Sequence, residues 1–413
     1  MAPKRKPCGD GRTMESSADL VEPEDGTMES PADFAKPVYL VTAREDDQAA
    51  YTVLKVDAAA AVTDDGTRPP RAQAVAALPG GEPGMSFVAA HSRRGSWFVA
   101  VGGGLRAGTI ILDPSTAATY RGPRLTEPKH EPVLLSHGGE LQRRRPLPAS
   151  LDRGALTGWH PLPSPPFFPL SLDPYEFRNP PEILVSSYAA VGDHILVSPQ
   201  PELMVGTYGF HVGNRTWEKV HEKNLPFVGQ AVPVGGGSLF AACAMSNKAA
   251  SIAGSVVSLF YMSIDDTSSS TSMAAVSTSL SYMSMDASSS TSTSVAAVST
   301  TTHSLLIQEF PVMASVGKVP RPLFCTMGKA RFYSIRLGSQ READLAKEEV
   351  QVILTAFRIE NIEAILSECR QSQGTKAKNL RVAVDVKEQS YTCNSKGRSG
   401  VLDSDIMVAA LSM

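Results

Sequence analysis

Histidine is the residue type in this chain with the widest chemical use, and eight histidines are present. His130 and His137 are close together in the sequence, as are His211 and His221. Histidines that bind zinc commonly form a closely spaced pair with a carboxylate or a cysteine nearby. Neither pair fits this pattern. The sequence therefore predicts surface histidines and no metal site.

The five cysteines are scattered, odd in number and never spaced as C-x-x-C; they are Cys8, Cys243, Cys325, Cys369 and Cys393. This arrangement disfavours a disulfide framework and a zinc site, and it indicates a reducing compartment. A copper radical oxidase would need two histidines, two tyrosines and a cysteine such as Cys325 around one axis. No spacing in the chain identifies that set.

Motifs for nucleotide binding and for hydrolysis are not evident either. Gly102, Gly103 and Gly104 precede a strand, whereas a dinucleotide-binding loop follows a strand and opens a helix. No Gly-x-Ser-x-Gly elbow occurs. The formal net charge is only −3, without the basic excess of a nucleic-acid-binding protein. We predict no cofactor and no nucleic-acid partner.

The most informative residues belong to a repeated structural pattern. Residues 109–116 combine an apolar run with a polar turn and are followed by Tyr120, and residues 207–214 repeat this order before Trp217. Trp159 follows another turn at a similar spacing. Strand, tight turn and aromatic-bearing strand in succession are typical of a β-propeller blade. We predict that Tyr120, Trp159 and Trp217 are structural aromatics that pack between blades.

Other short apolar segments bounded by turns predict further strands. The predicted strands are residues 38–41, 51–56, 85–90, 96–101, 185–190, 195–198, 216–220, 230–234, 238–243, 305–308, 323–327, 332–337 and 350–359. Residues 380–387 alternate most regularly and give the strongest single strand prediction. Residues 361–369 also allow two helical turns.

These elements predict an all-β fold, a propeller of about five to seven four-stranded blades over residues 37–413. One blade, over residues 142–174, is predicted to be degenerate or shortened, because proline-rich residues 161–169 cannot form a central strand. The polar residues 1–36 predict a disordered tail. Serine and threonine make up 24 of the 42 residues from 263 to 304, which predicts a disordered insertion.

Four segments together resemble the kelch-type β-propeller superfamily, and more closely a group of kelch-like proteins from grasses. The segments are residues 109–116, 178–182, 224–233 and 381–384. The resemblance covers residues 37–411 outside the Ser/Thr-rich insertion. The glycine pairs that open kelch repeats are irregular in this chain. The resemblance implies a propeller fold and assigns no catalytic residues.

The predicted function is a non-catalytic, monomeric scaffold that binds a protein partner through the loops at one propeller face. The alternatives are a carbohydrate-directed propeller enzyme, either an oxidase or a lyase, and a decayed paralogue. Bound copper would favour the enzyme. The chain shows no secretory signal and no apolar segment of membrane-spanning length. These features predict a cytoplasmic or nuclear protein, and basic residues 3–7 could serve as a nuclear import signal.

Overall fold

The computed structural model describes a set of strands and one short helix. The described residues are 37–46, 49–56, 72–92, 95–103, 108–126, 129, 131–136, 162–168, 182–245, 256–267, 302–314, 323–328, 330–337, 349–371, 380–394 and 407–412. The predicted tail at residues 1–36 and most of the predicted degenerate blade lie outside these ranges. Of that blade only residues 162–168 are described, and they contain a turn and no strand.

The strands fall into five groups of four. The first group is β1 (Val38–Asp46), β2 (Ala49–Val56), β3 (Gln73–Leu78) and β20 (Met407–Ser412). The second group is β4 (Met85–Ser92), β5 (Gly95–Gly102), β6 (Gly108–Asp113) and β7 (Ala118–Arg121). The third group is β8 (Val185–Val191), β9 (His194–Pro199), β10 (Thr207–His211) and β11 (Thr216–His221). The fourth group is β12 (Phe227–Gly235), β13 (Leu239–Ala244), β14 (Val256–Thr267) and β15 (Thr302–Ala314). The fifth group is β16 (Leu323–Gly328), β17 (Arg331–Leu337), β18 (Glu349–Ile359) and β19 (Val384–Asn394).

Each group is an antiparallel four-stranded unit, and the first unit takes one strand from the far end of the chain. β20 pairs with β1, so the order in that sheet is β20-β1-β2-β3. The third and fourth units join into one eight-stranded sheet through a short parallel pairing of β8 with β12. Four antiparallel strands per unit, with one unit completed by a strand from the other end of the chain, is propeller-like architecture.

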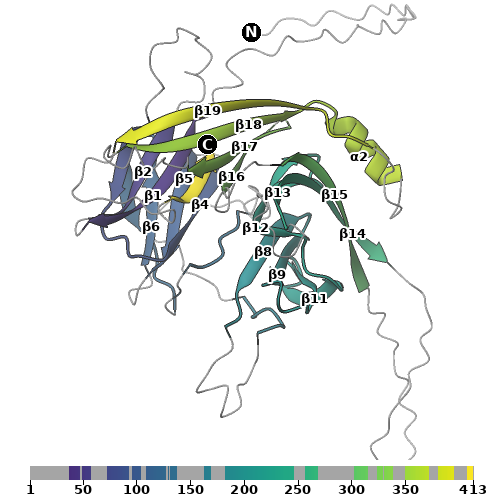
Figure 1. Cartoon of the computed structure of the whole chain (residues 1–413). Helices are drawn as coiled ribbons and strands as arrows, with labels where there is room; N and C mark the ends of the chain where they lie inside the picture. Colours follow the sequence, from purple (N-terminus) through teal and green to yellow (C-terminus); the bar gives the residue numbers. More distant parts are fainter. Residues whose placement is uncertain are drawn as a thin grey trace, which may run out of the picture.

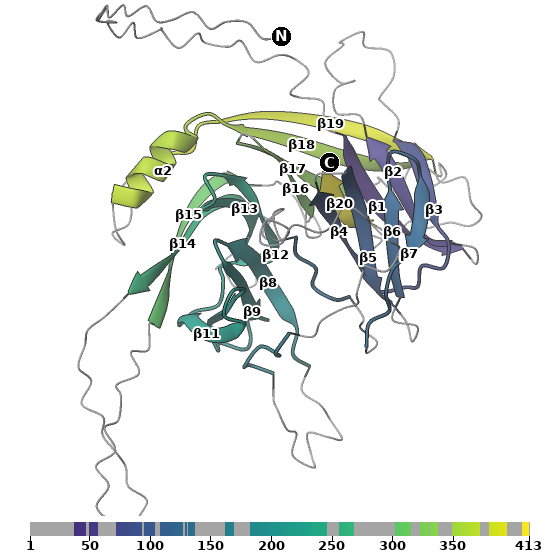
Figure 2. The same ribbon diagram turned by 180° about the vertical axis from the view of Figure 1, so that it is seen from behind.

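The units follow one another around the molecule. One strand of each unit lies beside the corresponding strand of the next unit, in the order β4, β20, β16, β12 and β8. Figures 1 and 2 show the units as neighbours around the molecule. Five described four-stranded units agree with the predicted all-β propeller. They also confirm most of the predicted strands, including the hairpin of β1 and β2.

Apolar layers fill the spaces between neighbouring units, because many strands are apolar on both faces. In β1, Val38 and Leu40 face Ile335 and Leu354 of the fifth unit. Tyr39 and Val41, which alternate with them, lie against the second unit. A strand buried on both faces reads as a continuous apolar run.

The repeated sequence pattern corresponds to two equivalent hairpins, β6–β7 and β10–β11. In the first, Asp113 Oδ1 accepts a hydrogen bond from the backbone N–H of Ser115, 2.9 Å away. In the second, His211 Nδ1 accepts one from the N–H of Gly213, 3.0 Å away. Four positions after each acceptor the chain enters the left-handed region, at Ala117 (φ 56°) and Arg215 (φ 57°). The repeat is therefore a structural one.

Helix α2 (Ile362–Gln371) lies between the fourth and fifth units and confirms the two helical turns predicted at residues 361–369. Its Ile365, Leu366 and Cys369 are buried in the layer between these units. A Cβ atom at Gly236 (φ +61°) would lie only 2.5 Å from Leu366 Cδ1. The Gly-rich turn after β12 thus leaves the space that the helix occupies.

The strand predicted at residues 380–387 is wrong in its first half, because β19 begins only at Val384. Residues 380–383 run beside the start of α2 instead, where Asn361 Nδ2 donates to the carbonyl of Arg381 and Asn361 Oδ1 accepts from the N–H of Ala383, both at 2.8 Å. Leu380 and Val382 pack against the core, so their alternation reflects burial and not strand pairing.

Strands β14 and β15 extend to both edges of the Ser/Thr-rich segment. They are paired along their whole length, from Val256 with Ala314 to Thr267 with Thr302. Strand pairing therefore includes residues 263–267 and 302–304 of the segment predicted as an insertion. Residues 268–301 lie outside the described ranges.

Candidate functional site

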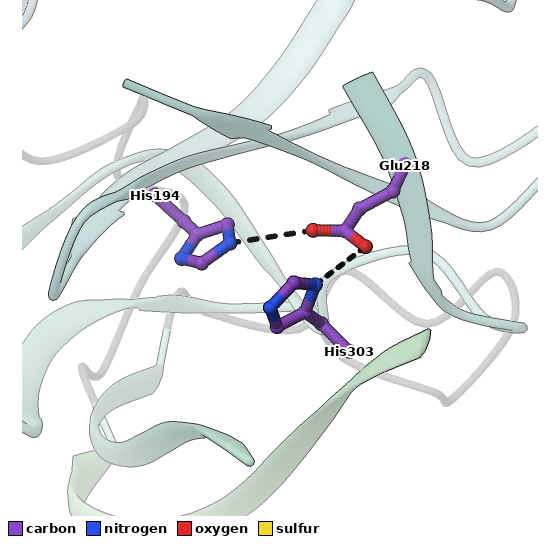
Figure 3. Close-up of side chains that lie close together, drawn as sticks. All are labelled: His194, Glu218 and His303. Carbon is purple, nitrogen blue, oxygen red and sulfur yellow. Dashed lines mark hydrogen bonds and ion pairs between the residues drawn. The ribbon is translucent and has the colours of Figure 1, made fainter. Parts of the chain in front are cut away.

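Two histidines and a glutamate from three strands meet at one end of the boundary between the third and fourth units. His194 begins β9, Glu218 lies in β11, and His303 lies near the start of β15 (Figure 3). Nε2 of His194 is 3.3 Å from Oε1 of Glu218. Nδ1 of His303 is 2.7 Å from Oε2 of the same carboxylate. We call these three residues the His–Glu–His cluster.

The register of the third unit explains why His194 and Glu218 face the same way. On β10, Gly209 pairs with Leu196 of β9 on one side and with Glu218 of β11 on the other. His194 is two positions from Leu196, so His194, Gly209 and Glu218 share one face of the sheet. Gly209 carries no side chain, and a Cβ atom there would lie 3.5 Å from His194 Cδ2. The tighter contact of such a Cβ atom would be with Val220 Cγ1, at 3.0 Å, so the glycine leaves room for the packed Val220 side chain.

The cluster closes one end of the apolar layer between the two units. Leu196 and Val220, each two positions from a cluster residue, pack in that layer with Leu305 of β15. His303 is two positions before Leu305 and lies on the same strand face. The polar side chains of the cluster thus lie at the end of the apolar layer, where β11 lies beside β15.

Burial changes the acid–base behaviour of His194. Its side chain is 8% exposed. Loss of solvent lowers the pKa of His194 below its usual value of 6.5, and the neighbouring His211 adds to this lowering, while Glu218 acts in the opposite direction. At neutral pH the imidazole is therefore neutral. A neutral imidazole is the form of histidine that binds a metal ion.

His211 lies next to the cluster but is oriented by its own turn. Its ring centroid is 4.8 Å from that of His194 and 6.2 Å from that of His303. Nδ1 of His211 accepts hydrogen bonds from the N–H groups of Gly213 and Asn214. Because Nδ1 is an acceptor, a neutral His211 carries its proton on Nε2.

The cluster offers three donor atoms suited to a transition metal. One ring nitrogen from each histidine and one Glu218 oxygen all lie within 4.8 Å of one another. The sequence analysis missed this group, because it considered His211 and His221 but not His194 and His303. No local spacing could have revealed it, since the three residues come from three strands of two units.

A second feature is the loop between β9 and β10, residues 200–206, which we call the Met204 loop. The side chain of Asn224 fixes this loop. Its Oδ1 accepts a hydrogen bond from the N–H of Gly206, and its Nδ2 donates one to the carbonyl of Leu203, both at 2.9 Å. Nδ2 also lies 3.3 Å from the carbonyl of Gln200. The loop is therefore held from both ends by one side chain.

The Met204 loop presents apolar side chains to solvent. Met204 is 85% exposed, and Val205 beside it is 37% exposed. Leu184, which is 56% exposed, adjoins the loop, because its backbone N–H donates to Gln200 Oε1 and its carbonyl accepts from the Gln200 N–H. Three exposed apolar side chains therefore lie on or beside one fixed loop.

The predicted structural aromatics have different surroundings. Tyr120 lies on the outermost strand β7 and is 57% exposed, which does not fit the buried packing role assigned to it. Trp217 contacts Phe210, with ring centroids 5.1 Å apart, and its Nε1 donates to the carbonyl of Pro163 at 2.8 Å. The described residues around Trp217 therefore include a proline-rich segment. Trp159 lies outside the described ranges.

The other candidates of the sequence analysis do not join the cluster. His130 and His137 lie outside the described ranges. Nδ1 of His221 forms hydrogen-bond contacts with the backbone of Lys223, two residues further along the chain. Cys325 is buried between the first and fifth units, away from the described histidines of the third and fourth units. No disulfide joins the buried cysteines Cys243, Cys325 and Cys369.

The fold defines the class of protein, an all-β protein of propeller-like architecture. The chain belongs to the family described as "Protein of unknown function (DUF1668)", whose family profile matches residues 35–391. No curated protein matches the chain by sequence. Among solved structures, the WD40 domain of SCAP from fission yeast is similar to 90% of this chain and 68% of that chain, at 8% identity and a TM-score of 0.21. In the described part of the chain, no helix has the length and apolar character needed to cross a membrane.

Proposed function

We propose that this protein is a non-catalytic scaffold of kelch-like type that binds another protein through the Met204 loop. The observation that carries the proposal is the exposure of Met204 on a loop that Asn224 holds in place. A monomeric protein leaves few large apolar side chains so exposed unless they meet a partner.

A fixed loop is well suited to recognition. Binding orders less of the protein when the contact residues are already held in one conformation, so less entropy is lost. Methionine is flexible and polarisable at its tip, and it adapts to apolar pockets of different shape. The partner that fits is a protein with a small apolar pocket for Met204, flanked by apolar contacts to Leu184 and Val205.

The buried cysteines support a reducing compartment for this scaffold. Cys243, Cys325 and Cys369 are all buried, and no disulfide joins them. Proteins with several free cysteines are typical of the cytoplasm and nucleus, which is where we propose that the scaffold acts.

Site-specific photo-crosslinking tests the proposal. A photo-reactive phenylalanine analogue replaces Met204 in the full-length protein, which is expressed in cells that normally make it. We expect discrete crosslinked protein species after illumination. The matched control carries the same analogue at Tyr120, which is also exposed but lies on another unit, and we expect no such species from it.

Competition makes the test specific. Excess unlabelled wild-type protein is expected to suppress the crosslinks from position 204, whereas excess Met204→Asp protein is not, because a carboxylate is poorly accommodated in an apolar pocket. If position 204 crosslinks no more than position 120, or if both competitors act equally, the proposed binding surface is wrong.

A further inference from the structure

We propose that His194, Glu218 and His303 bind a zinc ion that joins the third and fourth units of the fold. The inference goes beyond the scaffold function and does not depend on it. It rests on the donor set, on the distances within the cluster and on a buried ring nitrogen that lacks a hydrogen bond.

The distances are close to those of a zinc site. Ligand atoms about 2.0–2.1 Å from a tetrahedral zinc ion lie about 3.3 Å from one another. Nε2 of His194 and Oε1 of Glu218 are already 3.3 Å apart. The contact of His303 Nδ1 with Oε2 of Glu218, 2.7 Å, is a hydrogen bond and would open slightly as the ion enters. Only small side-chain movements are therefore required.

The buried nitrogen of His194 is the independent observation. Nε2 of His194 has no hydrogen-bond partner among the described residues. Water does not replace such a partner freely, because the residue is buried and only 6% exposed. Its contact with Glu218 has the length of an ion pair but not the geometry of a hydrogen bond. A buried polar atom without a partner costs free energy. A zinc ion between His194 and Glu218 would satisfy it.

Zinc binding requires that the proton on Nδ1 of His303 leave that atom. Without the ion, the N–H at Nδ1 of His303 donates to the Glu218 carboxylate. If the ring is neutral, this proton moves to Nε2 and none is released; if both ring nitrogens carry a proton, the one on Nδ1 goes to solvent. His211 does not join as a ligand, because its Nδ1 accepts two backbone N–H bonds and its Nε2 therefore carries the proton.

The donor set selects the kind of metal. Calcium and magnesium prefer oxygen ligands, whereas two imidazoles and one carboxylate suit zinc and its neighbours in the first transition series. Zinc has no preferred geometry from its d electrons, so it accepts ligands supplied by three strands. With three protein ligands, one coordination position is left for water or for another group.

The ion would link two units of the fold through its ligands. His194 and Glu218 belong to the third unit and His303 to the fourth. His303 is also the second residue of β15 and lies at the end of the Ser/Thr-rich segment. Metal binding would therefore fix the start of β15 against β9 and β11.

Metal titration of the full-length protein tests the site. The purified protein is stripped with a chelator, and zinc chloride is then added in a calorimeter. We expect one zinc ion per chain. His303→Ala and Glu218→Gln remove one ligand each, and we expect each to weaken binding by more than about 100-fold, since losing even a residue that only orients a ligand costs 10–100-fold.

His221→Ala is the matched control, because His221 lies on the same strand as Glu218 but outside the cluster. We expect it to bind zinc as the wild type does. Thermal unfolding keeps the test decisive if a variant folds poorly, since zinc should raise the Tm of the wild type and of His221→Ala but not of the ligand variants.

The absence of zinc binding by folded wild-type protein would overturn the proposal. Equal affinity in the wild type and in His303→Ala would also overturn it, because the zinc would then bind elsewhere. Loss of zinc binding in His221→Ala to the same extent as in the ligand variants would contradict the assignment of the ligands.

Discussion

Cys325 lies in the apolar layer between the first and fifth units, and these surroundings change its acid–base behaviour. Its neighbours there include Val38, Ile335 and Tyr391. Burial raises the pKa of the Cys325 thiol from 9.0 to about 12, against a smaller opposite effect of the Tyr333 backbone. The thiol is therefore protonated and unreactive in the folded protein.

This shift predicts a specific loss of stability at alkaline pH. Above pH 9 the thiol ionises in the unfolded chain but not in the folded one, so the unfolded state gains stability until the pH reaches about 12. The contribution of Cys325 to the free energy of unfolding therefore falls by at most about 1.4 kcal/mol per pH unit. We expect the destabilisation caused by Cys325→Ala, measured by urea unfolding, to shrink between pH 8 and 10.5.

Ser334→Ala is the control, because Ser334 is buried in the neighbouring strand β17 and does not titrate in this range. Its effect on the free energy of unfolding is expected to be constant over the same pH interval. A Cys325→Ala effect that stays constant or grows with pH would show that the thiol is not buried as described.

The sequence identified individual residues of the candidate site only in part. His211 was considered, and it lies beside the cluster, but its own turn orients it. His194, Glu218 and His303 were not grouped, because strand register and the contact of β11 with β15 bring them together. These are long-range properties that residue spacing along one chain does not encode. The zinc site is visible only once the sheets are assembled.

At the scale of elements, the Met204 loop depends on a side chain outside it. Asn224 follows β11, and its amide serves the loop as both donor and acceptor. Aspartate at this position would have the same size and would keep the acceptor oxygen for Gly206, but it would lack the N–H donor for Leu203. The carbonyl groups of Leu203 and Gln200 would then face a negative charge.

We therefore expect Asn224→Asp to destabilise the protein by about 1–3 kcal/mol, the cost of losing hydrogen bonds to partly buried groups. The effect should be strongest in the loop. Hydrogen exchange followed by mass spectrometry is expected to show faster exchange at residues 203–206, and crosslinking from position 204 should weaken.

The matched control is Asn214→Asp, which makes the same substitution at an exposed turn between β10 and β11. It should leave both the stability and the exchange of residues 203–206 unchanged. If Asn224→Asp behaves like Asn214→Asp, the loop is not held by Asn224 and the basis for its role in binding is lost.

Local pattern predicted the elements well where hydrogen bonds stay within one hairpin. The turns at Asp113 and His211 were recognised from their sequence, and their equivalent geometry confirms the repeat. The prediction for residues 380–383 was wrong because apolar alternation reports burial and not the partner of the backbone. There the backbone bonds to Asn361, twenty positions away from Arg381.

At the scale of the whole molecule, the two ends of the described chain share one sheet. β20 pairs with β1 along Val38–Val41, and its Ala409 and Leu411 join the apolar layer against the second unit. Sequence patterning predicted the all-β propeller class but not this pairing, because no local signal states which distant strand completes the first unit. The last described strand thereby completes the first unit of the row on which both candidate sites lie.

The most direct test of this propeller-like arrangement is an engineered disulfide between β1 and β20. Val38 and Ser412 are opposite each other in the register, and the Cα atoms of such a pair are about 4.5–5.5 Å apart, which a disulfide can span. The control pairs Val38→Cys with Met407→Cys, five positions further along β20. At about 3.3 Å per residue that distance cannot be bridged.

Peptide mapping by mass spectrometry under non-reducing conditions detects the disulfide between positions 38 and 412. We expect the Val38→Cys/Ser412→Cys protein to form the disulfide nearly completely in the folded state, and the control protein to remain unlinked. A folded protein in which the two introduced thiols stay unlinked, or in which the control pair links equally well, would contradict the propeller-like arrangement in which the two ends of the described chain share one sheet.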